Sequence, residues 1–89
     1  GFKHVVLKPH FIDSLSNYNS EHSGPYGKIV SSWKRIGKTI FYHVIIPANS
    51  NATIYFPITK RQKVYVDNKQ IKNPSKYFIR SGNYTFIIK

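Results

Sequence analysis

Cysteine is absent from the 89 residues, and so is methionine. Without cysteine the chain can form no disulfide, no thiolate nucleophile and no sulfur-based metal site. Because the sequence begins at Gly1 and contains no methionine, we interpret it as a piece of a longer polypeptide. No stretch of about 20 apolar residues is present that could cross a membrane, and no signal or transit peptide is recognisable.

Acidic side chains are nearly absent, with 3 Asp and Glu against 14 Lys and Arg. The three are Asp13, Glu21 and Asp67. General acid–base hydrolysis usually needs two positioned carboxylates. Asp67 stands next to Asn68, a pairing typical of a turn. We therefore predict no catalytic residue in this chain.

Clusters that could hold a metal or a cofactor are also missing. The histidines are dispersed over predicted strands and loops: His4, His10, His22 and His43. Metal sites need ligands that converge from fixed spacings. The sequence contains no P-loop, no G-x-G-x-x-G and no G-x-S-x-G motif. We predict neither a metal site nor a cofactor.

The excess of positive charge, with a pI near 10.1, raises nucleic-acid binding as one possible function. The basic residues are scattered, however, and no block of five like charges occurs. The signature of an RNA-recognition strand is absent as well. Nucleic-acid binding is therefore the least favoured function, and Lys60, Arg61 and Lys63 are the residues whose mutation would test it.

Alternating apolar residues, rich in β-branched and aromatic side chains, predict a chain made of strands. The predicted strands are 2–7, 28–35, 39–46, 52–56, 63–66, 70–71 and 83–88, with 14–23 a loop or an irregular edge strand. Turn signals separate them, and no segment has helical periodicity. We predict an all-β fold, an antiparallel Greek-key β-sandwich of about seven to eight short strands, with Trp33 near the centre of its core.

Two of these runs are apolar on both faces, which a small sandwich with one core does not require. In 39–46 the inward residues alternate with Phe41, His43 and Ile45, and 2–7 is nearly as apolar. An exposed apolar face generally marks a partner surface. We predict that Phe41, His43 and Ile45 pack against another part of the same polypeptide. Tyr55 and Tyr65 are secondary candidates for stacking on a sugar.

Four segments, in order and with matching spacing, resemble one protein family. Gly1–Pro9 fits G-[FY]-K-H-[IV]-x-[IL]-[KR]-P, and Gly24–Trp33 contains P-Y-G-x-I-x-S-x-W. Val44–Pro57 fits V-x-I-P-x-N-x-x-A-x-[VI]-x-[LF]-P, and Ser81–Phe86 fits S-G-x-Y-x-F. Together they resemble the C-terminal domain of bacterial α-L-rhamnosidases over essentially the whole chain.

The resemblance implies that residues 1–89 are a single C-terminal β-sandwich domain of a larger multidomain enzyme. That enzyme would be an inverting glycoside hydrolase of terminal α-L-rhamnosides, with its catalytic glutamates on a preceding (α/α) barrel. The domain itself would be a non-catalytic accessory that packs on the barrel. Its partners would be the catalytic domain and, through it, a rhamnose-containing glycan, with neither nucleic acid nor membrane. The parent enzyme would be periplasmic or extracellular. The alternative functions are a carbohydrate-binding module or a basic nucleic-acid-binding domain.

Overall fold

Strands make up the regular secondary structure of the computed structural model, which describes residues 3–11, 17–24, 27–57 and 61–89. They are β1 (Lys3–Leu7), β2 (Asn17–Gly24), β3 (Gly27–Ile36), β4 (Thr39–Ile54), β5 (Val64–Val66), β6 (Lys69–Gln70) and β7 (Tyr77–Ile88). Within these ranges there is no helix, and so none suited to spanning a membrane. The predicted all-β class is confirmed.

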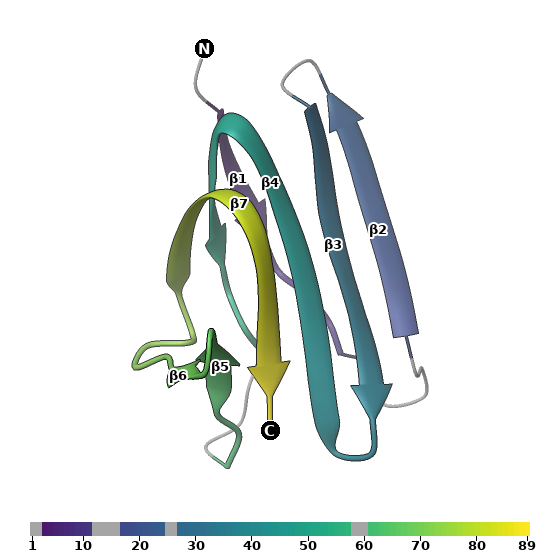
Figure 1. Ribbon diagram of the computed structural model, residues 1–89, viewed down its shortest axis with the longest axis vertical. Helices are drawn as coiled ribbons and strands as arrows, with labels where there is room; N and C mark the ends of the chain where they lie inside the picture. The colour runs from purple at the N-terminus through teal and green to yellow at the C-terminus, as the bar shows by residue number, and fades with distance from the viewer. Residues whose placement is uncertain (1–2, 12–16, 25–26, 58–60) are drawn as a thin grey trace.

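The seven strands hydrogen-bond into one sheet with the order β2-β3-β4-β7-β5-β6, and β1 joins it by pairing with β4 (Figure 1). Every pairing is antiparallel except that of β1 with β4, which is parallel. The sheet is therefore mainly antiparallel, as the short connections predict. The Greek-key arrangement of a two-sheet sandwich stays a prediction.

The two longest strands, β4 and β7, bend at the same height and fold the sheet over itself. Their register jumps from Ile46–Gly82 to Asn51–Arg80, so β4 has more residues than β7 at the bend. Asn49 there has a φ of 62° and Gly82 a φ of 144°. Asparagine and glycine are the residues that tolerate such left-handed backbone most readily. Two strand boundaries predicted from sequence are therefore wrong: residues 47–51 bend without ending β4, and β7 starts at Tyr77.

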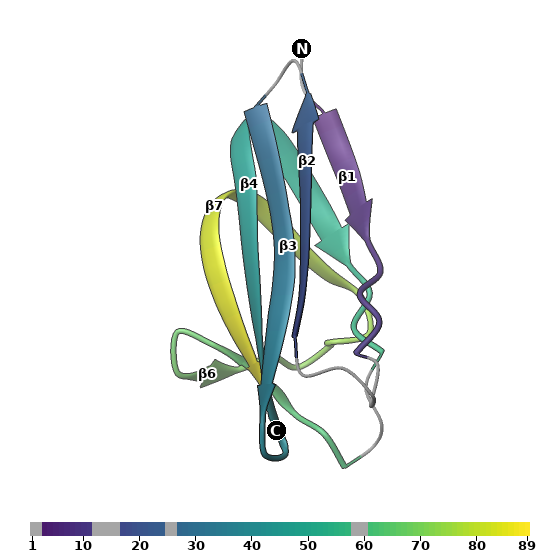
Figure 2. The same ribbon diagram turned by 90° about the vertical axis from the view of Figure 1, so that its right-hand side faces the viewer.

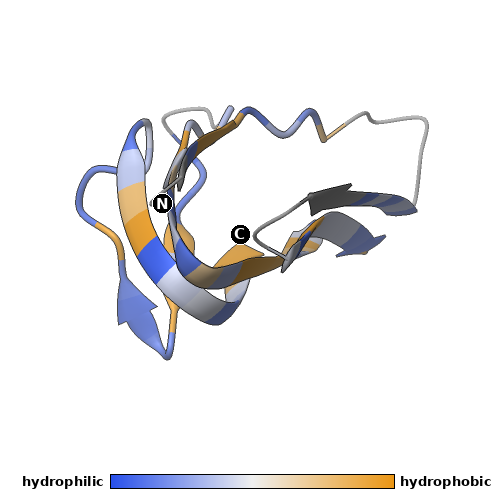
Figure 3. Cartoon of the chain, turned by 90° about the horizontal axis from the view of Figure 1, so that it is seen from above, coloured by the Kyte–Doolittle hydropathy of each residue, from blue (hydrophilic) through white to orange (hydrophobic). Residues whose placement is uncertain are grey.

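The bend produces two layers (Figure 2). The front layer consists of β2, β3, β4 up to Ile46, β7 from Gly82, β5 and β6. The back layer consists of β1 with the remaining halves of β4 and β7. Seen from above, the sheet is strongly curved (Figure 3). One chain thus covers its own inner face without a second, separate sheet.

The core fills the space between the layers. Its buried members are Trp33, Ile40, Tyr42, Val44, Ile46, Ala52, Ile54, Phe56, Val64, Ile71, Ile79, Phe86 and Ile88. Phe86 of the front layer meets Tyr77 of the back layer edge to face, with ring centroids 5.9 Å apart. Trp33 is buried as expected, but the largest side chains with no exposed surface are those of Tyr42 and Phe86. These two aromatics form the centre of the core, and Trp33 lies beside them.

The phenol of Tyr42 places a polar group at the centre of this core. Its hydroxyl is hydrogen-bonded to Ser31 Oγ at 2.6 Å, which satisfies a group that would be costly to bury alone. Burial raises the pKa of Tyr42 to about 12, while the hydrogen bond with Ser31 offsets part of that shift. Tyr42 is therefore a neutral core residue with a satisfied hydroxyl.

Gly27, at the start of β3, shows how tightly the strands pack near the bend. Its φ is 122°, and a Cβ at this position would lie 2.7 Å from Cβ of Pro47. No ordinary side chain could occupy that space without moving the backbone. The Gly24–Trp33 segment therefore has glycine here because β3 closely approaches the bend of β4.

The edge strands β2 and β6 are polar, as expected for edges. Residues 17–24 form β2, an edge strand, which was one of the two predictions for 14–23; residues 12–16 lie outside the described part. Val6 of β1 is 52% exposed, so the outer face of the predicted strand 2–7 is open at this residue. The β5–β6 hairpin turns at Asp67 and Asn68, both with positive φ, the backbone that a type I′ turn requires.

Candidate functional site

The structure separates the two described carboxylates. Glu21 lies on β2 and pairs with Lys28 Nζ at 2.9 Å, with both side chains about half exposed. Asp67 lies in the β5–β6 turn at the other end of the sheet. Four strands lie between β2 and β6, each adding about 4.8 Å. Glu21 and Asp67 therefore cannot act together on one bond. Asp13 lies outside the described residues.

Two of the described histidines, His4 and His43, make hydrogen bonds to neighbouring strands. His43 Nδ1 lies 3.2 Å from Thr85 Oγ1, across from β4 to β7. His4 bridges two side chains of β4, Asn51 through Nδ1 and Thr53 through Nε2. Among residues whose positions are described, no group of three His, Asp or Glu side chains converges. The two histidines brace neighbouring strands.

Phe41, His43 and Ile45 lie where the alternation predicts, on the outer face of the front layer. All three are partly exposed, while their neighbours Tyr42 and Val44 are fully buried on the inner face. The sheet register sets further apolar side chains beside them, because Val30 of β3 pairs with Ile45, and Ile87 of β7 pairs with Phe41. We call these five outward-facing residues, Val30, Phe41, His43, Ile45 and Ile87, the front patch. The back layer does not cover it.

Tyr55 and Tyr65 are not brought together. Tyr55 follows β4 in the back layer, where its N–H donates to the Leu7 carbonyl at 2.9 Å, whereas Tyr65 is on β5 of the front layer. Each ring has a lysine ammonium near it: Lys8 Nζ is 5.6 Å from the Tyr55 centroid and Lys89 Nζ is 5.3 Å from that of Tyr65. The two tyrosines do not form a common aromatic platform.

Three lysines gather around the β5–β6 hairpin. An open cleft of about 620 Å³ there is lined by Lys69, Lys72 and Lys76, with the carboxylate of Asp67 among them. The half-buried ring of Tyr77 also lines it, but this ring packs edge to face on Phe86. The residues proposed for nucleic-acid contact do not line this cleft: Arg61 and Lys63 lie elsewhere, and Lys60 is not described.

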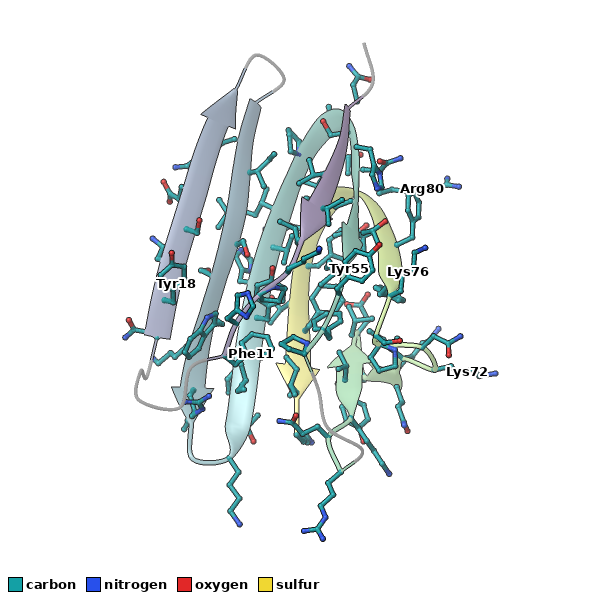
Figure 4. The ribbon with its side chains drawn as sticks, turned by 180° about the vertical axis from the view of Figure 1, so that it is seen from behind. Phe11, Tyr18, Tyr55, Lys72, Lys76 and Arg80 are labelled. Atoms are coloured by element: carbon teal, nitrogen blue, oxygen red, sulfur yellow. The ribbon has the colours of Figure 1, made fainter. Side chains whose placement is uncertain are left out.

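A second hollow forms where β4 and β7 bend. It has a volume of about 430 Å³ and is lined by Asn49, Ser50, Asn51, Phe78, Arg80 and Ser81. We call it the bend cavity. The bend itself brings these residues together, because 49–51 and 78–81 are consecutive short stretches on the two paired strands. Figure 4 shows Arg80 projecting away from the sheet beside the bend of β7.

The bend cavity combines one exposed aromatic ring with several polar side chains. Phe78 is 52% exposed, and its ring lies nearly parallel to that of His4 with centroids 6.2 Å apart. Ser50 is only 3% exposed, and its Oγ has no hydrogen-bond partner in the described part of the chain. Buried hydroxyls are usually satisfied, so Ser50 is an exception.

Sequence reasoning missed the bend cavity. Tyr77, Phe78 and Ile79 are three consecutive apolar residues, so the sequence does not distinguish Phe78 from a core residue. The available signal was the alternation, because inward Tyr77 and Ile79 place Phe78 outward. Nothing in the sequence places Arg80 next to Asn51, because that pairing depends on the register after the bend.

Comparison with known proteins gives consistent matches. Residues 1–71 match the family model described as the bacterial alpha-L-rhamnosidase C-terminal domain. An alpha-L-rhamnosidase from Formosa agariphila is 30% identical over 73 residues, which are 82% of this chain and 8% of that protein. The solved alpha-L-rhamnosidase from Dictyoglumus thermophilum has the same fold, with a TM-score of 0.81 at 17% identity, over 94% of this chain and 11% of that chain. The chain thus corresponds to a small part of each relative.

Proposed function

The chain belongs to the family of bacterial α-L-rhamnosidase C-terminal domains, and from that premise we propose that it is a non-catalytic accessory domain of such an enzyme. In this proposal residues 1–89 form one domain of a longer polypeptide. A preceding (α/α) barrel carries the catalytic glutamates and hydrolyses terminal α-L-rhamnosides of a rhamnose-containing glycan. The domain packs on that barrel and supports it.

The carboxylates argue for the non-catalytic part of this proposal. Glycoside hydrolysis uses two carboxyl groups about 5–10 Å apart. Glu21 and Asp67 are at opposite ends of the sheet, and only Asp13 remains in the sequence. The two carboxylates in the described part of the chain therefore do not form the pair that cleaves a glycosidic bond, which supports a non-catalytic role.

The front patch is the observation that best supports packing of this domain on the catalytic domain. Its apolar members are neighbours across three adjacent strands of the sheet, and they face away from the core. Side chains that contribute nothing to the domain's own core, yet lie together, are typical of an interface with another domain. We propose that the front patch is the surface that contacts the catalytic domain.

Substitution of Phe41 tests the docking surface. In the longer polypeptide, Phe41→Asp places an unpaired charge in the proposed interface, which costs several kcal/mol. We expect easier proteolytic release of this domain and a lower melting temperature of the whole enzyme. Val6→Asp is the matched control, because Val6 is an apolar residue of the back layer that is 52% exposed. Equal effects of the two variants would contradict docking through the front patch.

An activity assay tests the non-catalytic part. The purified 89-residue chain is expected not to hydrolyse an aryl α-L-rhamnoside. Hydrolysis that disappears in Asp13→Asn or Glu21→Gln would overturn the proposal, because it would show that the chain's own carboxylates act on the substrate.

A further inference from the structure

We propose that the bend cavity is a sugar-binding site that holds one pyranose ring, stacked on Phe78 and hydrogen-bonded to the polar side chains around it. Its volume of about 430 Å³ falls in the usual range for small-molecule sites, roughly 300–1,000 Å³. The site lies at the bend, whereas the front patch lies on the outer face of the front layer. The two surfaces can therefore act independently.

The aromatic wall is Phe78. Its parallel neighbour His4 lies against part of the ring, and about half of the side chain is open to solvent. An aromatic ring offers a flat apolar surface, and the C–H face of a pyranose is a flat apolar surface of similar size. Val6 is equally exposed in the same layer, but it does not line the cavity and carries no ring.

The polar wall offers donors and acceptors of the kinds that sugar hydroxyls need. Asn49 and Asn51 contribute amides, and Arg80 contributes a planar fork of N–H donors. Ser81, which is exposed, adds a hydroxyl. Amide, guanidinium and hydroxyl groups beside one aromatic ring in a hollow are the usual composition of a ligand site.

His4 positions Asn51. When Nδ1 of His4 carries the proton, it donates to Asn51 Oδ1, and Nε2 accepts a hydrogen bond from Thr53 Oγ1. The two N–H donors of the Asn51 amide then remain for another partner. His4 also supports the Phe78 ring, so one histidine of β1 holds both an aromatic and a polar member of the site.

The backbone at the site is of a kind that often marks function. Asn49 has a φ of 62° within a strand that continues on either side. Residues held in such conformations cluster at ligand sites. Residues of three of the four segments that carry the family resemblance also meet here: His4, the run from Asn49 to Asn51, and Ser81. The shape of the bend already accounts for the positive φ of Asn49, so the observation that points to a ligand is the exposed ring of Phe78 beside these polar groups.

The choice of a sugar as occupant rests on the proposed function, since an α-L-rhamnosidase meets glycans. A nucleic acid fits less well, because the cavity offers one ring and one guanidinium, without the row of aromatics and cations that a single strand requires. A pyranose needs only one ring and a few hydrogen-bonding groups. The site would hold part of the glycan that the enzyme degrades.

A titration followed by two-dimensional amide NMR tests the proposal directly. The 89-residue chain is titrated with methyl α-L-rhamnopyranoside, with methyl α-D-glucopyranoside and with sodium sulfate. We expect one or both pyranosides to shift the amides of 49–51 and 78–82 with a Kd in the millimolar range, near 1 mM, which corresponds to about 4 kcal/mol. If neither pyranoside shifts these amides, or if sulfate alone does, the proposal is wrong.

Three variants sharpen the test. Phe78→Ala should weaken sugar binding about tenfold, while Val6→Ala should leave it unchanged. Asn51→Ala should weaken binding severalfold, because it removes the two amide N–H donors that the polar wall offers. If Asn51→Ala and Phe78→Ala both bind like the parent chain, the cavity is not the site. Such a failure leaves docking through the front patch standing, because that is tested by Phe41→Asp in the longer polypeptide.

Discussion

The two layers of this folded sheet expose outer surfaces of different character. On the front layer, the outward residues Phe41, Ile45 and Ile87 are partly buried by one another and by their strand neighbours. On the back layer, Val6 and Phe78 are each 52% exposed and lie among polar and basic side chains. The first surface has apolar side chains on three adjacent strands, with His43 between Phe41 and Ile45, and the second has separate apolar groups beside a hollow.

This difference suggests a division of roles between the layers. Apolar side chains gathered on three adjacent strands are suited to contact with another protein surface, because both surfaces lose contact with water together. An isolated ring beside amides and a guanidinium is suited to a small polar ligand. The bend of β4 and β7 creates both surfaces at once, since it turns one strand pair into the front and the back of the molecule.

The largest expected effect is a loss of stability when a side chain of the inner face, rather than one of an outer surface, is truncated. Phe86→Ala removes a fully buried ring that packs on Tyr42 and Phe56. We expect a loss of about 3–5 kcal/mol in the free energy of unfolding, enough to unfold much of a domain of this size. Phe78→Ala, the same change in the exposed ring of the back layer, should cost less than about 1 kcal/mol. Denaturant unfolding measures both, and similar losses would show that the layers are assigned wrongly.

The next effect concerns the buried phenol between the layers. Because burial raises the pKa of Tyr42 from 10.0 to about 12, the folded chain holds this proton more tightly than the unfolded chain. Its contribution to stability is complete below pH 10 and is lost as the pH rises through about 12. The loss should be on the order of 2–3 kcal/mol.

Denaturant unfolding of Tyr42→Phe over the same alkaline range provides the check. This variant should lack the alkaline loss, while Tyr55→Phe, which changes a partly exposed ring of the back layer, should keep it. An unchanged alkaline loss in Tyr42→Phe would mean that other groups cause it.

The smallest effect is expected at the edge of the front layer. Glu21→Gln breaks the pair with Lys28, whose N···O distance is 2.9 Å. Because both side chains are about half exposed, we expect a change within about 0.5 kcal/mol, and less at high salt. A larger loss, measured by thermal unfolding at two salt concentrations, would show that the edge is more important to the fold than the inner packing implies.

Sequence alone predicts the strands that alternate regularly. Ile40, Tyr42, Val44 and Ile46 are inward in the structure as in the pattern, because a period of two fixes which face each side chain occupies. The bend was missed because Pro47 and the asparagines after it have turn chemistry, and such residues usually end a strand. Here they only bend it, since β7 continues to pair on both sides. The parallel pairing of β1 with β4 likewise depends on tertiary structure, and no local sequence pattern predicts it.

The candidate surfaces were predictable to different degrees. The outward position of Phe41, His43 and Ile45 follows from the same alternation that places Tyr42 and Val44 inward. The bend cavity does not follow from any pattern, because its members lie on two strands and meet only after the register jump between Ile46 and Asn51. The unpartnered hydroxyl of Ser50 is visible only once every neighbour is placed.

The central claim, that the front patch docks on the catalytic domain, is tested most directly by thiol reactivity. The chain has no cysteine, so His43→Cys and Val6→Cys each give it a single thiol. In the isolated chain both should react with a maleimide. In the longer polypeptide, with any other reactive thiols removed, His43→Cys should react at least about tenfold more slowly than in the isolated chain, as expected for docking worth at least about 1.4 kcal/mol. Val6→Cys should react at the same rate in both. Equal rates for His43→Cys in the isolated chain and in the longer polypeptide would contradict the claim.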